Sequence, residues 1–192
     1  MTSAHNGQRR RGRPLLLAAA LLLVGLVDEV AGLTGWDIWQ WLVAAGLVVA
    51  IGLHRLASML EGRACRTVRV LTMIAAVGAG LYLAVTFGFL AADAVGLRLP
   101  TPLQGLFMIG ALSLLVGIVL ATVRIGGAMI RQGAGTRGTG SLVVLIGVLF
   151  LSPLPALLAV DVPDAIPLTG VAALVVVLGV LGTARCPPSG EA

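Results

Sequence analysis

Hydrophobic positions along this chain fall into six long runs separated by short polar segments. The runs occupy residues 14–33, 38–56, 69–93, 102–123, 142–160 and 165–184. As helices they are long enough to cross roughly 30 Å of hydrocarbon, which takes about 20 apolar residues. The pattern predicts an all-α, polytopic integral membrane protein with six transmembrane helices. One membrane domain, residues 14–184, would then join a basic N-terminal tail, residues 1–13, to a C-terminal tail, residues 185–192.

The composition indicates that lipid is the solvent of this chain. Of its 192 residues, 58% are hydrophobic and 11% are charged, and the mean hydropathy is +1.05. A chain this apolar cannot hide its hydrophobic surface inside one soluble core. We expect the lipid bilayer to be its main partner, with other membrane-protein subunits as a further class of partner.

The charged residues are sorted between the two ends of the runs. All 13 basic residues are arginine, and all but Arg98 lie on the side of the N-terminal tail. The acids, except Glu61 and Glu191, lie at or near the opposite side. Because positive segments stay in the cytoplasm, we predict a cell-membrane protein with both termini cytoplasmic. The arginines are not interleaved with aromatic residues, so the net charge of +5 does not indicate nucleic-acid binding.

The first run follows Arg9, Arg10, Arg11 and Arg13, and a basic segment before an apolar one also describes a cleaved secretory signal. No A-x-A cleavage site follows the run, and the run is long enough to span a bilayer. We therefore predict an uncleaved first helix that starts in the cytoplasm.

Two rows of small residues predict where helices pack. The row in 69–93 consists of Ala76, Gly80, Ala84 and Gly88. The row in 102–123 consists of Gly110, Ser113, Gly117 and Ala121. Small residues let two helix backbones approach closely, and close packing holds helices together in lipid. We expect these rows to face each other and the third helix to lie at the centre of the bundle.

Polar, aromatic and proline residues near the outer helix ends predict a pocket open to the outer face. They are Asp28, Glu29, Trp39, Asp93, Pro153, Pro155 and Asp161. An acid within a membrane-spanning segment is a functional-site candidate, and prolines break a helix and free its carbonyls. Each feature also has a structural interpretation: a carboxylate wetted at the interface, an aromatic belt, or a plain kink.

The six helices also form three consecutive hairpins, each with an acid before its turn and an arginine at its end. Two of the turns, Asp37 to Gln40 and Thr101 to Gln104, have the pattern of a capping box. Descent from a two-helix unit and the constraint of topology explain the repetition equally well.

The residues contain no pattern typical of catalysis. There is no serine elbow and no His, Cys, Asp and Glu set with metal-ligand spacing, so we predict no enzyme, no metal and no cofactor. Gly133 to Gly138 matches G-x-G-x-x-G, but membrane helices flank it in place of a βαβ unit, so we predict a linker.

Two functional hypotheses fit this chain. The first is a non-catalytic bundle that acts as a structural, regulatory or assembly partner in the membrane, favoured by the lack of charge at mid-membrane. The alternative is a small-solute permeation protein, or the substrate-binding subunit of a transporter, that uses the outer-face pocket. Replacing Glu29 and Asp93 by their amides would separate the two, because a scaffold should change little.

Overall fold

The computed structural model describes residues 2–34, 38–58, 60, 62–97, 102–132, 137–151 and 165–183. The regular elements in these ranges are α1 (Thr2–Ala31), α2 (Ile38–Ala57), α3 (Gly62–Ala94), α4 (Pro102–Gln132), α5 (Arg137–Phe150) and α7 (Ala165–Thr183). The described chain is thus all-helical, and the predicted fold class is confirmed at that level.

Four of these helices contain segments long and apolar enough to cross a membrane. The segments are Arg13–Ala31, Ile38–Ala57, Gly62–Ala94 and Gly105–Arg131. The described parts of α5 and α7 add shorter apolar stretches, Gly138–Phe150 and Leu168–Gly182. Exposed leucine, valine and isoleucine side chains cover all these helices, and water would not tolerate so large an apolar surface. The chain is therefore built to be embedded in a membrane.

Several helices are longer than their apolar runs predict. α3 starts at Gly62 instead of residue 69, and α4 continues to Gln132 instead of ending near residue 123. α5 starts at Arg137 instead of residue 142. The extra turns of α3 and α4 include arginine, alanine and methionine, which favour a helix, whereas residues 137–141 of α5 are mostly glycine, threonine and serine, which do not. Hydropathy marks the hydrocarbon-facing part of a helix and not its ends.

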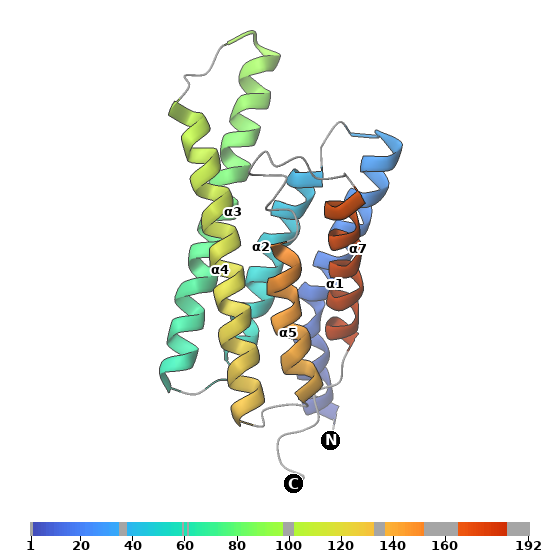
Figure 1. Ribbon diagram of the computed structural model, residues 1–192, viewed down its shortest axis with the longest axis vertical. Coiled ribbons are helices and arrows are strands. Elements are labelled where there is room, and N and C mark those ends of the chain that lie inside the picture. Colours follow the sequence, from blue (N-terminus) through green and yellow to red (C-terminus); the bar gives the residue numbers. More distant parts are fainter. Residues whose placement is uncertain are drawn as a thin grey trace.

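The helices stand side by side along the long axis of the molecule (Figure 1). Each described helix packs against the next one in the chain, and α7 packs against α1, so the bundle closes on itself. α2 also contacts α4 across this ring. The three predicted hairpin pairs therefore all pack, but they share the bundle with equally direct contacts between hairpins.

The centre of the bundle is α2, and the prediction that α3 would be central is wrong. Half of the apolar segment of α2 is buried, compared with 28% of that of α3. Contacts with α1, α3 and α4 surround α2, whereas α3 packs against α2 and α4 and turns its remaining surface outward. A row of small residues shows that a helix can be approached closely, but not from how many sides.

The small residues of α4 lie against α3 at very short range. A Cβ placed on Gly110 would lie 2.8 Å from the carbonyl oxygen of Gly78, and one on Gly117 would lie 2.8 Å from the Cβ of Ala75. A Cβ placed on Gly78 would in turn lie 2.8 Å from the Cβ of Ser113. Ala121, the last member of the α4 row, is fully buried. The backbones of α3 and α4 are therefore in direct contact at Gly78, Gly110 and Gly117, where no side chain would fit.

On α3 the predicted row does not form this contact. Nothing lies within 4 Å of a Cβ placed on Gly80 or Gly88, Ala84 is exposed, and Ala76 is half-buried. The buried face instead contains Ala75, Gly78, Ala79, Tyr82 and Thr86. A strict four-residue spacing drifts about 40° around the helix at each step, whereas alternating three- and four-residue spacing stays on one side. The predicted row therefore turns away from α4.

Candidate functional site

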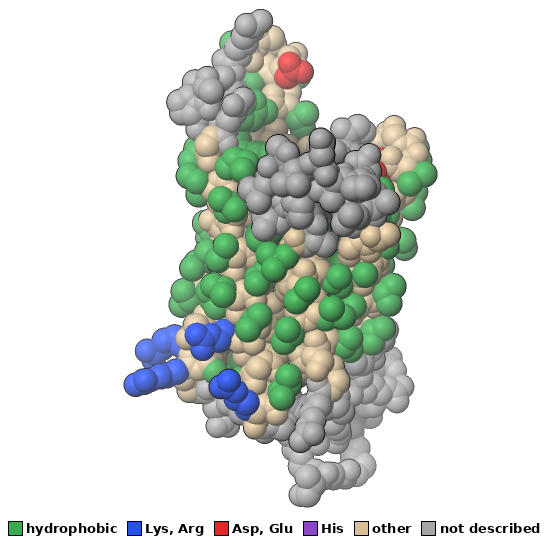
Figure 2. Space-filling view, viewed as in Figure 1, with side chains coloured by type: hydrophobic (Ala, Val, Ile, Leu, Met, Phe, Trp, Pro, Cys, Tyr) green, Lys and Arg blue, Asp and Glu red, His purple; other side chains and the backbone are tan. Residues whose placement is uncertain are grey.

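The charges of the described residues are separated between the two ends of the bundle. Asp28, Glu29 and Asp93 lie where α1 and α3 finish, which we call the acidic end. The exposed arginines of α2, α3 and α4 lie at the other end, which we call the basic end. Figure 2 shows this separation over one face, with hydrophobic side chains between. The predicted pocket residues that are described all belong to the acidic end.

Asp28 ties the end of α1 to the first turn of α2. Its side chain is only 2% exposed. Oδ1 accepts a hydrogen bond from the backbone N–H of Thr34 at 2.8 Å, and Oδ2 accepts bonds from the Thr34 hydroxyl and, at 2.9 Å, from the indole N–H of Trp41. The Asp28 carbonyl also accepts the N–H of Gly32, whose φ of +61° ends α1 in the left-handed conformation. The carboxylate thus has three donors from the segment that follows.

The aromatic partner of Asp28 is Trp41, whereas the sequence singled out Trp39. Trp39 is half-buried and packs against the hydrophobic core. Trp41 can reach α1 because Gly25 leaves space there: a Cβ on Gly25 would lie 2.5 Å from the Trp41 Cβ. The indole ring therefore lies on α1 with its N–H directed at the carboxylate. The spacing of Gly25 and Asp28, about one turn apart on one face, is the only sequence signal for this arrangement.

Glu29 caps the start of α2. Its Oε2 atom accepts the backbone N–H of Ile38, the first residue of α2, at 2.9 Å. A negative group at this position satisfies a free N–H and complements the positive end of the helix dipole. The predicted capping box placed the N-cap of α2 at Asp37, which lies outside the described residues. Local sequence patterns cannot find a cap that comes from the preceding helix.

The structure does not join Asp93 to the other two acids. Asp93 is exposed near the end of α3, and its carbonyl accepts the N–H of Gly96 at 3.0 Å. The α3–α4 pair extends beyond the neighbouring helices at this end (Figure 1), and α2 stands between α1 and α3. Pro153, Pro155 and Asp161 lie outside the described residues. Among the described members of the predicted pocket, Asp28 and Glu29 link α1 to α2, and the pocket as a whole stays a prediction.

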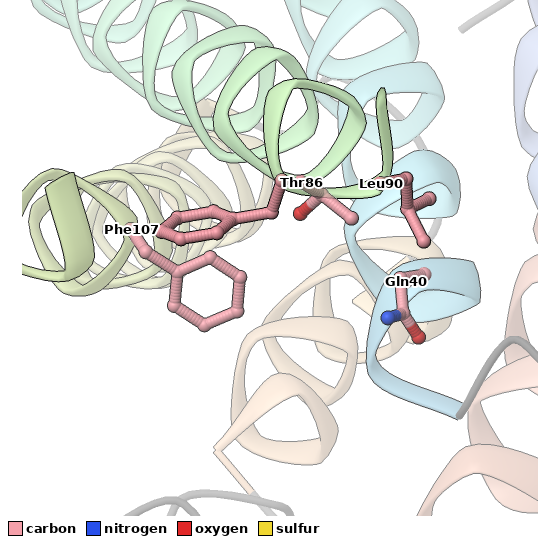
Figure 3. A pocket seen from close by; sticks show the side chains of 5 residues that line it. Gln40, Thr86, Leu90 and Phe107 are labelled. Carbon is pink, nitrogen blue, oxygen red and sulfur yellow. The ribbon is translucent and has the colours of Figure 1, made fainter. Parts of the chain in front are cut away.

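A cleft that the sequence did not predict lies between α2, α3 and α4 near the acidic end. It has a volume of about 370 Å³ and is lined by Gln40, Thr86, Phe89, Leu90 and Phe107. Figure 3 shows the Gln40, Thr86, Leu90 and Phe107 side chains around it. Its lining contains one amide, one hydroxyl and no charged group, so it suits an uncharged and largely apolar molecule.

One of the polar side chains that line this cleft is hydrogen-bonded within its own helix. The Thr86 hydroxyl donates to the carbonyl of Tyr82 at 2.9 Å, as threonines in membrane helices commonly do. The Tyr82 ring packs on Phe107 with their centroids 4.0 Å apart. Sequence reasoning missed the cleft because Phe89 of α3 and Phe107 of α4 line it only in the rotations that these two helices adopt.

Among the described residues no group of three or more His, Cys, Asp and Glu side chains is arranged to hold a metal ion. His54, at the basic end, is hydrogen-bonded through Nδ1 to the buried hydroxyl of Thr72 at 3.0 Å. That hydroxyl also donates to the carbonyl of Arg69 at 3.0 Å, so it accepts the His54 N–H. His54 thus links α2 to α3.

Comparisons of the chain with protein families, with curated proteins and with solved structures give no match.

Proposed function

We propose that this chain is a six-helix plasma-membrane bundle without catalytic activity, with both termini in the cytoplasm, that acts as a structural, regulatory or assembly partner of other membrane proteins. The apolar helices and the separation of arginines from acids support this placement in the bilayer.

The main support for the proposal is that Asp28 and Glu29 both accept hydrogen bonds from the segment that follows α1. Acids in membrane-spanning segments usually mark ion or proton pathways. Here one carboxylate takes three donors from Thr34 and Trp41, and the other caps α2. Both acids fasten α1 to α2, which is the task expected of acids in a rigid scaffold.

The outward surface of α3 is consistent with an assembly role. Gly80, Ala84 and Gly88 form a bare strip there, and no part of the described chain would meet a Cβ on either glycine. In lipid, such a strip lets a second helix come close.

The proposal can be tested by purifying the tagged full-length chain in native-lipid discs and identifying the co-purifying proteins by mass spectrometry. A stoichiometric partner that is reduced in a Gly80→Leu/Gly88→Leu variant would support the assembly role. A Val176→Leu/Val180→Leu variant serves as the control, because both valines are exposed on α7, which packs against α1 and α5. A chain that is recovered alone, at normal yield and stability, would contradict the proposal.

The cleft between α2, α3 and α4 favours a second candidate, the binding of a small uncharged solute by a permeation protein or transporter subunit. Its support is the apolar lining around Gln40 and Thr86. Leu90→Trp would fill the cleft from an exposed position, and Val77→Trp would add the same bulk elsewhere on α3. A small molecule that the wild type and Val77→Trp retain in discs, and Leu90→Trp loses, would favour this candidate. Equal retention by all three chains would count against it.

A further inference from the structure

The basic end of the α3–α4 pair carries a concentrated patch of arginines. α3 and α4 run antiparallel, with Gly117 opposite Ala75. Two turns further toward the basic end, Arg124 is level with Val68, between Arg66 and Arg69. Two more turns bring Arg131 level with the start of α3. The members of this α3–α4 arginine patch are Arg63, Arg66, Arg69, Arg124 and Arg131.

All five arginines of the patch are exposed. Figure 2 shows basic side chains gathered at the lower end of the view, over α3 and α4. The three acids in the described ranges lie at the opposite end of the bundle. One further acid, Glu61, precedes α3 in the sequence and lies outside those ranges. Within the described ranges, five positive charges therefore share one surface with no carboxylate among them.

Arg63 and Arg66 lie where a positive charge does not stabilise a helix. They occupy the start of α3, where the helix dipole is positive and the first backbone N–H groups lack intrahelical partners. No acid occupies the first turn of α3. This arrangement adds side-chain cations to a helix end that already attracts anions. An anion at this place would relieve the repulsion.

The surroundings of the patch point to the source of that anion. Val70, Met73 and Val123 are exposed directly beside the arginines and belong to the apolar, lipid-facing surface. The arginines therefore lie where hydrocarbon gives way to the headgroup layer. Guanidinium groups bind phosphate oxygens through paired hydrogen bonds, and basic clusters beside membrane helices attract anionic lipids.

We infer that the α3–α4 arginine patch binds the phosphate groups of anionic phospholipid headgroups. The site goes beyond the proposed assembly role, because it lies at the other end of α3 and needs no protein partner. One phosphate can accept hydrogen bonds from arginines of both helices, so a bound lipid would also hold the basic ends of α3 and α4 together.

The test measures the binding of phosphatidylglycerol to the purified full-length chain in neutral detergent, by native mass spectrometry during a titration. The test variant is Arg66→Gln/Arg124→Gln, which removes one charge from each helix of the patch. The control is Arg13→Gln/Arg55→Gln, which removes two exposed charges from α1 and α2 at the same end. At a typical contribution per basic residue, the test variant should bind about 30-fold more weakly. The control should bind like the wild type.

Two further arms make the assignment specific. Arg66→Lys/Arg124→Lys keeps the charge and should recover most of the affinity, since lysine binds phosphate as a point charge. Inorganic phosphate at millimolar concentration should not displace the lipid, and displacement would overturn the lipid as the source of the anion. Equal weakening in both glutamine pairs, or in neither, would overturn the site itself. Thermal stability of each variant in detergent identifies any that fail to fold, and Arg66→Gln or Arg124→Gln alone then replaces the pair.

Discussion

Replacing Gly110 by alanine should separate α3 from α4 and destabilise the bundle. The new Cβ would lie 2.8 Å from the carbonyl oxygen of Gly78 and 2.9 Å from the backbone nitrogen of Tyr82. Both obstacles are backbone atoms, so no side chain can rotate out of the way. Relief requires a shift of the whole of α3 relative to α4.

The expected cost follows from these distances. Ordinary contacts of a Cβ begin at 3.4 Å, so the helices must move apart by roughly 0.6 Å at this point. Overpacking of a close interface costs about 1–3 kcal/mol. Alanine recovers up to about 1 kcal/mol of helix propensity compared with glycine. With that recovery subtracted, the free energy of unfolding should fall by up to about 2 kcal/mol.

Gly105 supplies the matched control, because it lies on the same helix and nothing is within 4 Å of its Cβ position. Gly105→Ala should be neutral or stabilise by up to about 1 kcal/mol. Unfolding in mixed micelles of increasing dodecyl sulfate content, followed by circular dichroism, compares the two variants directly. The Gly78→Ala/Gly110→Ala variant should not show the sum of its two single effects, because both new carbons occupy the same contact.

A particular result would refute this account of the interface. If Gly110→Ala and Gly105→Ala behave alike, α3 and α4 do not touch at Gly110. If Gly80→Ala destabilises the bundle instead, the outward row that includes Gly80 and Gly88 is the true packing face, and the sequence prediction was right.

The connections between helices give three further predictions. Asp28→Ala should lower the melting temperature in detergent and shift the tryptophan emission, because Trp41 loses its acceptor; unchanged emission would contradict that hydrogen bond. Glu29→Ala should weaken the start of α2 more than Glu29→Gln, which keeps an acceptor for the first N–H, and hydrogen exchange at Ile38 should show the difference. Thr72→Val should cost about 1 kcal/mol in the same unfolding assay, because it removes the acceptor of the His54 bond at a buried position.

Hydropathy alone predicted the helices in the described part of each apolar run, because consecutive apolar residues leave few alternatives in lipid. The rotation of each helix about its own axis could not be predicted from hydropathy. Both faces of α3 are rich in alanine and glycine, so composition could not choose between the face with Ala75 and Gly78 and the face with Gly80 and Gly88. The α4 row, by contrast, meets its neighbour, because α4 has few small residues elsewhere in that stretch.

The candidate site could likewise be predicted only in part from the sequence. Asp28 and Glu29 stood out because acids are rare in membrane helices. Their partners, the Trp41 indole and the Ile38 N–H, depend on how tightly the α1–α2 connection folds back. The cleft depends on three helices at once, and no pattern within one helix reports it. Rare residues can be found from a sequence, but their contacts require the relative positions of the helices.

The contact between α1 and α7 has a consequence for how the bundle is made. Leu16 of α1 packs on the position of Gly182 in α7, so the first and last described helices meet near the last turn of α7. During synthesis α1 is made long before α7, so this seam must stay open until α7 has been synthesised. Its closure is the contact of highest sequence separation and should be the slowest step of assembly. A circular permutant that joins the end of α7 to the start of α1 and opens the chain between α4 and α5 would make the seam local, and the ring would then close early.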